Sequence, residues 1–173
     1  TATREQRWNI EHSIKSFAVS GNDLFYSSIA TPNLLFVHNG TDYNNITRNG
    51  ENVQNVPTMH MVADADGTNS TLYMICGNSI QTYDPTGSDF NDYEIGKYSV
   101  SDVRLGGAAE ISAYGGRMVI ADAANRRIGV YNSETNGYAW RSVDYAPGTA
   151  VAGKNSLLVA DNAADKIYIY EYD

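Results

Sequence analysis

The chain has 173 residues, of which 42% are apolar, and its 20 acidic side chains outnumber its 12 basic ones to give a formal net charge of −8. This composition allows one domain with a sizeable core and excludes a disordered acidic chain. It also disfavours binding to nucleic acids or to anionic membrane surfaces, because both require clusters of basic residues, and no apolar run reaches the about 18 residues that span a bilayer.

The first 48 residues contain a succession of four short segments with the pattern of strands. An apolar segment at residues 17–19 is followed by a hairpin pattern at residues 24–28 and 34–38, and then by a polar segment around residues 43–47. Gly, Asn, Asp and Pro stand between the segments. Apolar, β-branched and aromatic residues between such breakers are typical of strands joined by turns.

The same succession recurs three times downstream. The later segments are residues 60–63, 72–76, 79–83 and 93–98, then 111–114, 117–122, 127–131 and 138–143, and finally 149–152, 157–161 and 166–170. The third segments of the four repeats end at His38, Tyr83, Tyr131 and Tyr170, at intervals of 45, 48 and 39 residues. A period of about 40–45 residues with four strands in each repeat is typical of the blades of a β-propeller.

We therefore predict an all-β fold in which residues 1–173 form a single β-propeller domain of four four-stranded blades. The predicted blades cover about residues 13–48, 56–100, 108–145 and 147–173 plus 5–12.

The last repeat has no fourth strand of its own, and the N-terminal segment supplies a candidate. Residues 7–10, which include Trp8, resemble the outer strand around Trp140. We predict that this segment completes the last blade beside residues 166–170 and closes the ring, because closure limits unpaired strand edges. The alternative is that the chain is part of a propeller with six to eight blades.

Residues 121–131, Ala-Asp-Ala-Ala-Asn-Arg-Arg-Ile-Gly-Val-Tyr, resemble the NHL-type propeller repeat, whose core is an Ala-Asp pair, a short turn, a basic–Ile step and a strand. Residues 160–170 match this repeat less fully, and the two upstream repeats keep only the pattern of apolar positions. The resemblance implies the propeller fold. It implies no single function, because NHL-like propellers serve as lyases, lactonase-like hydrolases, RNA readers, extracellular sensors and adhesion modules.

One acidic loop is a candidate calcium site. Asp64, Asp66 and Asn69 place oxygen atoms near alternate positions around Gly67, as a calcium loop requires. The twelve-residue pattern is not completed, because the next acidic residue is Asp84. An ordinary acidic turn between two strands explains the same residues, since Asp, Gly and Asn favour turn conformations. Calcium is the only cofactor that the sequence suggests.

Two further sets of polar residues have both a functional and a structural interpretation. His60 lies on a predicted inner strand and is a candidate for the central channel, although no partner group is evident. Asp122 and Asp161 recur at equivalent positions after Ala121 and Ala160. They could form paired carboxylates, but recurrence favours a structural role in the turn that follows each strand.

Three Asn-X-Ser/Thr sequences are candidate glycosylation acceptors, at Asn39, Asn45 and Asn69. All three fall in predicted loops or outer strands, which is compatible with modification of a secreted protein.

The leading hypothesis is a non-catalytic extracellular β-propeller that acts as an interaction, adhesion or surface-assembly module at the cell surface. Its partners would be a protein or glycan ligand, or further copies of the chain, and neither nucleic acid nor membrane insertion is expected. The alternative is a metal-dependent propeller enzyme, a lyase or lactonase-like hydrolase, with a site in the central channel. No catalytic residues are assigned, because the predicted inner strands offer few reactive groups besides His60 and Glu110.

Overall fold

The computed structural model describes residues 13–21, 23–28, 35–38, 43–45, 47–48, 51–52, 58–66, 71–76, 79–83, 95–98, 110–135 and 137–172. All regular elements in these residues are strands, as predicted. Most of them belong to four sheets, which we number I to IV in chain order. Two short strands, β5 (Thr47–Arg48) and β6 (Glu51–Asn52), form a separate hairpin that was not predicted. The sequence between them is Asn49-Gly50, a pair favoured in two-residue turns.

Each of the four sheets is an antiparallel meander in which strands that follow one another in the chain are neighbours. Sheet I consists of β1 (Ile14–Ser20), β2 (Asp23–Ser28), β3 (Leu35–His38) and β4 (Tyr43–Asn45), and sheet II of β7 (Thr58–Ala63), β8 (Leu72–Cys76), β9 (Ser79–Tyr83) and β10 (Ile95–Tyr98). Sheet III consists of β11 (Glu110–Tyr114), β12 (Arg117–Asp122), β13 (Arg127–Asn132) and β14 (Gly137–Ser142), and sheet IV of β15 (Thr149–Ala152), β16 (Ser156–Asp161) and β17 (Lys166–Glu171).

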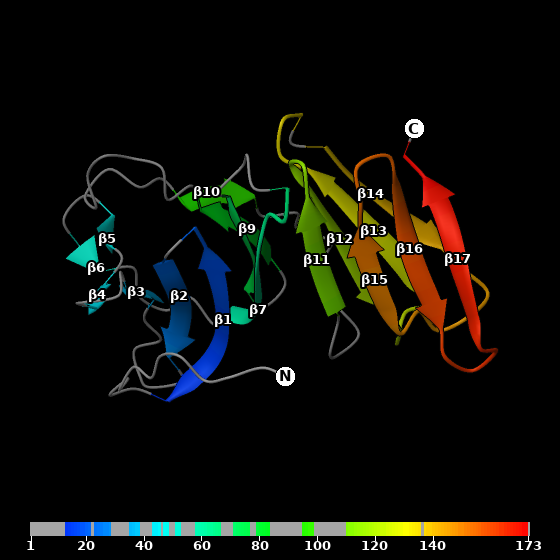
Figure 1. The fold of residues 1–173 in the computed structure, drawn as a ribbon, viewed down its shortest axis with the longest axis horizontal. Helices are drawn as coiled ribbons and strands as arrows, with labels where there is room; N and C mark the ends of the chain where they lie inside the picture. Colours follow the sequence, from blue (N-terminus) through cyan, green and yellow to red (C-terminus); the bar gives the residue numbers. More distant parts are fainter. Residues whose placement is uncertain are drawn as a thin grey trace, which may run out of the picture.

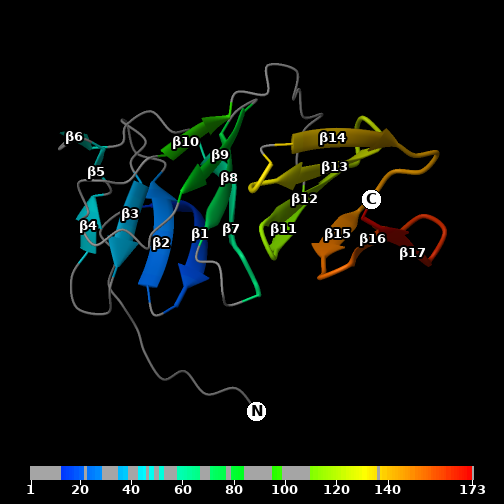
Figure 2. The ribbon, with the colours of Figure 1, turned by 90° about the horizontal axis from the view of Figure 1, so that it is seen from above.

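The sheets lie side by side in the order of the chain (Figure 1). Their first strands form a row in which β1 packs against β7, β7 against β11, and β11 against β15. Their last strands lie on the outside, so that the sheets spread as a fan around this row (Figure 2). The two ends of the row, β1 and β15, do not pack against each other in this way, so the described strands do not form a closed ring.

The core consists of layers of side chains between consecutive sheets. Because side chains alternate along a strand, each sheet has one face toward the preceding sheet and one toward the following sheet. The layer between sheets II and III contains Tyr73, Ile75, Ala113, Met118, Ile120 and Tyr131. The layer between sheets III and IV contains Val119, Ala121, Ile128, Ala150, Ala152, Leu157 and Val159. Face-to-face stacking of this kind explains why small and branched apolar residues fill both faces of the inner strands.

Aromatic pairs connect neighbouring sheets within these layers. Phe25 of sheet I contacts Tyr83 of sheet II edge to face, with 5.8 Å between ring centroids. Tyr73 of sheet II contacts Tyr131 of sheet III in the same way, at 6.3 Å. The Tyr73 hydroxyl also donates a hydrogen bond to Ser133 Oγ at 3.3 Å. Such edge-to-face pairs add to the apolar burial that holds two sheets together.

The buried tyrosines predict a loss of stability at high pH. Burial raises the pKa of Tyr73 from 10.0 to about 12. The hydrogen bond to Ser133 lowers this pKa in part, and the nearby carboxylate of Asp64 raises it further. The folded protein therefore keeps this proton at a pH where the unfolded chain loses it. The contribution of Tyr73 to the free energy of unfolding is fully present below pH 10 and is lost as the pH rises through about 12. This contribution is on the order of 2 kcal/mol.

We expect the thermal unfolding midpoint to fall steeply above pH 10, and Tyr73→Phe to make the fall shallower. Circular dichroism at a series of pH values measures this. Tyr168→Phe is the control, because it removes a hydroxyl from a half-buried ring of sheet IV. Equal slopes for the wild type and Tyr73→Phe would contradict the assignment.

The recurrent Asp residues hold the turns that follow the second strands of sheets III and IV. Oδ1 of Asp122 accepts a hydrogen bond from the Asn125 N–H at 3.3 Å. Oδ1 of Asp161 accepts one from the Ala163 N–H at 3.1 Å and one from the Ala164 N–H at 3.3 Å. These bonds confirm the structural interpretation of the two carboxylates.

Sheet IV has three strands in the part of the chain that the structure describes, and its last strand β17 pairs there with β16 alone. Trp8 and residues 5–12 lie outside the described residues. Their pairing with β17, the closure of the ring and the number of blades therefore stay predictions. Among the described residues there is no helix with the length and hydropathy needed to cross a membrane.

Candidate functional site

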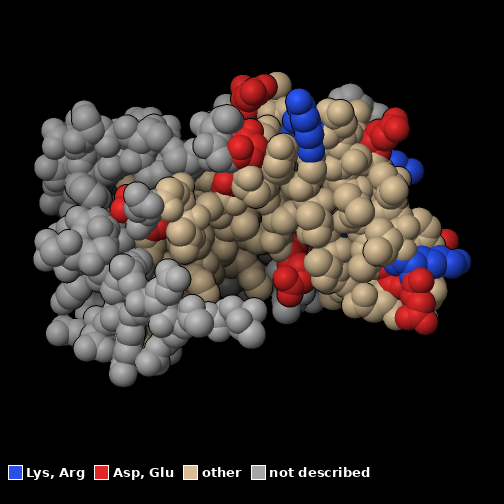
Figure 3. Space-filling view, in the orientation of Figure 1, with Lys and Arg blue, Asp and Glu red and all other residues tan. Residues whose placement is uncertain are grey.

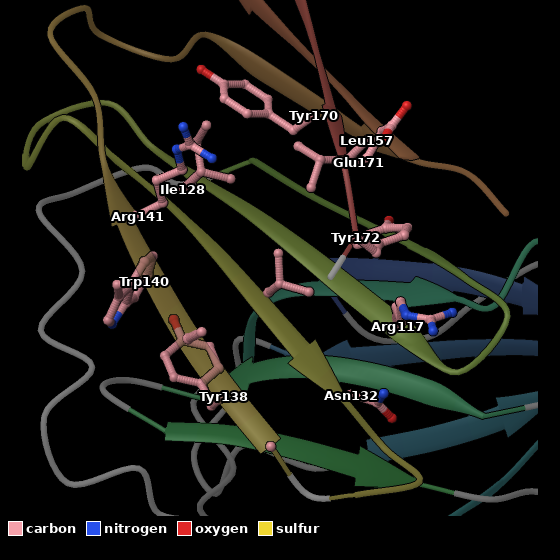
Figure 4. Close-up of a pocket in the computed structure, with 13 residues that line it drawn as sticks. Arg117, Ile128, Asn132, Tyr138, Trp140, Arg141, Leu157, Tyr170, Glu171 and Tyr172 are labelled. Atoms are coloured by element: carbon pink, nitrogen blue, oxygen red, sulfur yellow. The ribbon is translucent and has the colours of Figure 1, made fainter. Parts of the chain in front are cut away.

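A groove of about 530 Å³ lies between the outer strands of sheets III and IV (Figure 4). Strand register determines which side chains form its walls. Ile128, Val130 and Ala139 lie on the face of sheet III that is turned to sheet IV. Leu157 and Tyr170 pair across β16 and β17 and face them from sheet IV. The small side chain of Ala139 leaves space between the outer strands, and the walls are mainly apolar.

Two arginines of sheet III place their guanidinium groups over tyrosine rings of sheet IV. The Arg141 guanidinium lies 4.9 Å from the ring centroid of Tyr170, and the Arg117 guanidinium lies 4.9 Å from that of Tyr172. Both distances are typical of cation–π interactions, and these interactions hold the two guanidinium charges beside the groove. Glu171 also borders the groove, but it alternates with Tyr170 along β17, and its side chain points away from the other lining residues (Figure 4). Among the described residues that line the groove, the side chains that face it therefore carry positive charge without an opposing carboxylate.

Tyr170 and Tyr172 form a tyrosine wall of the groove, and neighbouring rings hold this wall in place. The hydroxyls of Tyr145 and Tyr170 are 2.8 Å apart and form a hydrogen bond. The Tyr145 ring also stacks on Tyr168, with 4.6 Å between centroids and 19° between planes. Burial, followed by the hydrogen bond to Tyr170, raises the pKa of Tyr145, so this hydroxyl stays protonated at neutral pH. The wall is thus formed before any ligand arrives.

Tyr138 and Trp140 belong to β14, which borders the groove, but their rings lie on the opposite face of sheet III, toward sheet II. They lie over Gly129 and contact each other edge to face at 5.0 Å. Arg127 covers the Trp140 ring at 3.9 Å and bonds Asp122 through Nε at 2.9 Å. Both rings pack against the core layer between sheets II and III. They support the groove from behind and are not available to stack on a ligand within it.

The candidate calcium residues take different positions. Asp64 is 8% exposed and bonds the turn of the next sheet: Oδ1 accepts the Gly115 N–H and Oδ2 the Gly116 N–H, both at 2.7 Å. Oδ1 also accepts the Asp66 N–H at 3.2 Å. Asn69 lies outside the described residues. Calcium would have to compete with three amides for Asp64, and its binding stays a prediction. The described residues contain no group of three His, Cys, Asp or Glu side chains that could hold a metal ion.

His60 lies on β7 opposite Ile75 of β8. It alternates with Met61, and so shares a sheet face with Val62, which packs against the layer between sheets II and III. The half-buried imidazole is therefore placed beside this layer, and its role as a channel group stays a prediction.

The glycosylation candidates are only partly placed. Asn45 ends β4, and its side chain is outside the described part of the structure. Asn39 and Asn69 lie outside the described residues. Use of the three acceptors stays a prediction.

The groove could not be predicted from the sequence, because its walls come from strands in two repeats. One local signal was present. Tyr168, Tyr170 and Tyr172 alternate along one segment, which places them on one face of a strand. The arginines that cover two of these rings come from β12 and β14, and no local pattern connects them with β17.

No protein-family model matches the sequence, and no curated protein matches it significantly. Similar solved structures include the β-propeller domain of Cps50 (Swd1) from Myceliophteria thermophila, with a TM-score of 0.63 and 10% identity over 94% of this chain and 55% of that one. The computationally designed protein Ika4 has a TM-score of 0.58 and 9% identity over 95% of this chain and 94% of its own. YCF48 bound to the D1 peptide has a TM-score of 0.53 and 11% identity over 96% of this chain and 56% of that one.

At such identities the similarity shows the fold alone, which is a β-propeller type of arrangement. The chain spans nearly all of Ika4 but only about half of Cps50 and YCF48.

Proposed function

We propose that this chain is a non-catalytic, extracellular protein-interaction module of the β-propeller type. Its binding site is the groove between sheets III and IV, and its ligand is a short segment of a partner protein that carries an acidic residue beside an apolar one. The observation that supports this most directly is the preformed apolar groove flanked by Arg117 and Arg141.

The charge of the groove selects among peptide ligands. The chain as a whole has a net charge of −8, so its overall field repels an acidic segment. The two guanidiniums make the groove a local exception. A contrast of this kind steers an acidic ligand to one place and disfavours it elsewhere.

A protein ligand fits the groove better than a glycan. Sugars stack on exposed aromatic faces, but guanidiniums already cover the rings of Tyr170 and Tyr172. Ala139 is exposed and Val130 is half-buried, so an aliphatic side chain in the groove can contact both without displacing either arginine. That YCF48 is bound to a peptide accords with this proposal.

The NHL type of the repeat is part of the proposal. Arg126 and Asp165, which end the turns after Asp122 and Asp161, both have left-handed φ values, at 49° and 52°. Sheets III and IV thus share a turn that follows an Ala-Asp pair, as the resemblance implies. The extracellular location rests on the candidate acceptors Asn39, Asn45 and Asn69.

The alternative of a metal-dependent enzyme receives less support from the contacts. Asp64, Asp122 and Asp161 use their carboxylate oxygens to hold turns. A catalytic role would require each of them to exchange these bonds for a metal or a substrate.

Selection of peptides from a random displayed library on the immobilised protein tests the proposal. We expect enriched peptides to carry Asp or Glu beside an aliphatic or aromatic residue. Arg141→Glu should weaken their binding about tenfold or more, because it reverses a charge at the groove. Fluorescence anisotropy with one enriched peptide measures the change.

Lys15→Glu is the matched control. It makes the same change in net charge at an exposed residue of β1 that does not line the groove, and it should leave the affinity nearly unchanged. Enrichment of basic peptides, or equal losses in the two variants, would contradict the proposal.

A further inference from the structure

The two ends of the fan carry exposed apolar side chains on their outward sheet faces. The exposed side chains on the outward face of sheet IV are Val151 (52%), Leu158 (39%), Ile167 (68%) and Ile169 (70%). Those on the outward face of sheet I are Phe17 (63%) and Val19 (59%), whereas Tyr26, which lies opposite Phe17 on the same face, is buried. The surface over β15, β16 and β17 shows charged side chains mainly at its margins (Figure 3). Contiguous apolar surface of this kind marks an interaction site.

Sheet IV repeats the positions that sheet III uses to bind its neighbour. Leu158 stands three residues before Asp161, as Val119 stands three before Asp122. Val119 is fully buried against sheet IV, whereas Leu158 is 39% exposed. Ile128 and Ile167, which follow the paired basic residues of β13 and β17, are 3% and 68% exposed. The outward face of sheet IV thus carries the side chains that a following sheet would bury.

Sheet I carries the complementary set. Phe17 and Val19 stand four and two residues before Gly21, as Ile111 and Ala113 stand before Gly115. In sheet III these two positions pack against sheet II, and Ala113 is only 3% exposed. The outward face of sheet I therefore has the pattern of a face that receives a preceding sheet. The two open faces continue the stacking that joins sheets I to IV.

The extent of the fan relative to a longer propeller is compatible with two copies in one ring, although the chain also spans 94% of the designed protein Ika4. The chain superposes over 94% of its length on 55% of the Cps50 propeller, with a TM-score of 0.63. Its sheets therefore follow the course of about half of that longer chain.

We propose that two copies of this chain associate head to tail, with sheet IV of each copy on sheet I of the other, to complete one ring. Each contact joins two different faces, and a two-fold axis closes the pair, so that no apolar face stays open. The peptide groove lies on the other face of sheet IV, so this association is independent of the proposed function and is tested separately.

The mass of the 173-residue chain in solution is the first test. Sedimentation equilibrium over a range of protein concentrations should give a dimer of twice the chain's 18.9 kDa. A monomer at all concentrations would show that the open faces are closed within one chain or by another partner. An unlimited series of larger species would show an open filament. Either result would overturn the proposal.

Complementary variants test which faces meet. The contact between β12 and β15 in the existing layer predicts that β1 of one copy meets β16 of the other. Leu158→Lys and Phe17→Glu should each weaken dimerisation at least about a hundredfold, because each buries an unpaired charge. An equimolar mixture should form dimers again, with one unaltered contact and one Lys–Glu contact.

Circular dichroism must show that both variants are folded, which is expected because both side chains are exposed. Lys154→Glu, in the loop between β15 and β16, should dimerise as the wild type does. Single variants that still dimerise fully, or a mixture that stays monomeric, would overturn the head-to-tail arrangement. Peptide binding by the Leu158→Lys monomer should persist, which separates this result from a failure of the groove.

Discussion

Replacement of Asp64 by Ala should lower the free energy of unfolding by about 3 kcal/mol, the largest effect that we expect from a single polar residue. The carboxylate connects sheets II and III by accepting the amides of Gly115 and Gly116 at 2.7 Å each. Ala would leave both N–H groups without this acceptor, and the Gly116 bond is buried. A buried unpaired amide costs about 1–3 kcal/mol, and bonds to a charged acceptor lie at the upper end of the range.

Urea unfolding followed by tyrosine fluorescence measures this difference. Asp64→Asn should lower the free energy of unfolding by about half as much as Asp64→Ala. The amide keeps one carbonyl acceptor but places an N–H₂ group against a backbone amide donor. Asp66→Ala separates this role from calcium binding. The backbone N–H of residue 66 can still donate to Asp64, so a smaller loss is expected. Equal losses for Asp64→Ala and Asp66→Ala, together with stabilisation by added calcium, would favour the calcium loop instead.

Gly129→Ala should destabilise the protein by about 2 kcal/mol through crowding alone. A Cβ at this position would lie 2.5 Å from Trp140 Cζ3 and 2.6 Å from the Tyr138 hydroxyl oxygen. The two rings cannot both withdraw easily, because Arg127 covers Trp140 and both rings pack against the core. Gly129 is thus required by the close approach of the rings, and the same rings support the back of the groove.

A double-mutant cycle with Trp140→Ala tests this explanation. The cost of Gly129→Ala should be smaller when Trp140 is absent, since the closest of the three contacts is removed with it. Thermal unfolding gives the stabilities, and near-ultraviolet circular dichroism reports the displacement of Trp140. The same cost in both backgrounds would show that the glycine is needed for another reason.

The strands could be predicted because each one is specified locally. In the segment around Val119 and Ile128, apolar residues alternate or cluster over five or six positions and end at Asp or Asn. This pattern requires no knowledge of neighbouring sheets. The period between repeats then gave the propeller-type arrangement, with which the solved structures agree. The β5–β6 hairpin was missed because two-residue strands contain too few residues to show alternation.

The sites were harder to predict because they depend on which repeats face each other. The residues of its own loop predicted Asp64 to be a calcium ligand, but its carboxylate oxygens accept hydrogen bonds from a turn about fifty residues away. The groove likewise requires Arg141 to reach Tyr170 across two sheets. Neither contact leaves a signal within one repeat.

By itself, the sequence determined the strands of the four sheets, their order, the turns closed by Asp122 and Asp161, and the apolar pattern of both faces of each sheet. Hydrogen bonding within a hairpin and the alternation of side chains are short-range effects, so local residues are sufficient to specify them. Only the tertiary structure decided which of these faces are covered. Sheets III and IV have the same pattern, yet Val119 is buried and Leu158 is exposed, because sheet IV packs on Val119 whereas no described sheet packs on Leu158.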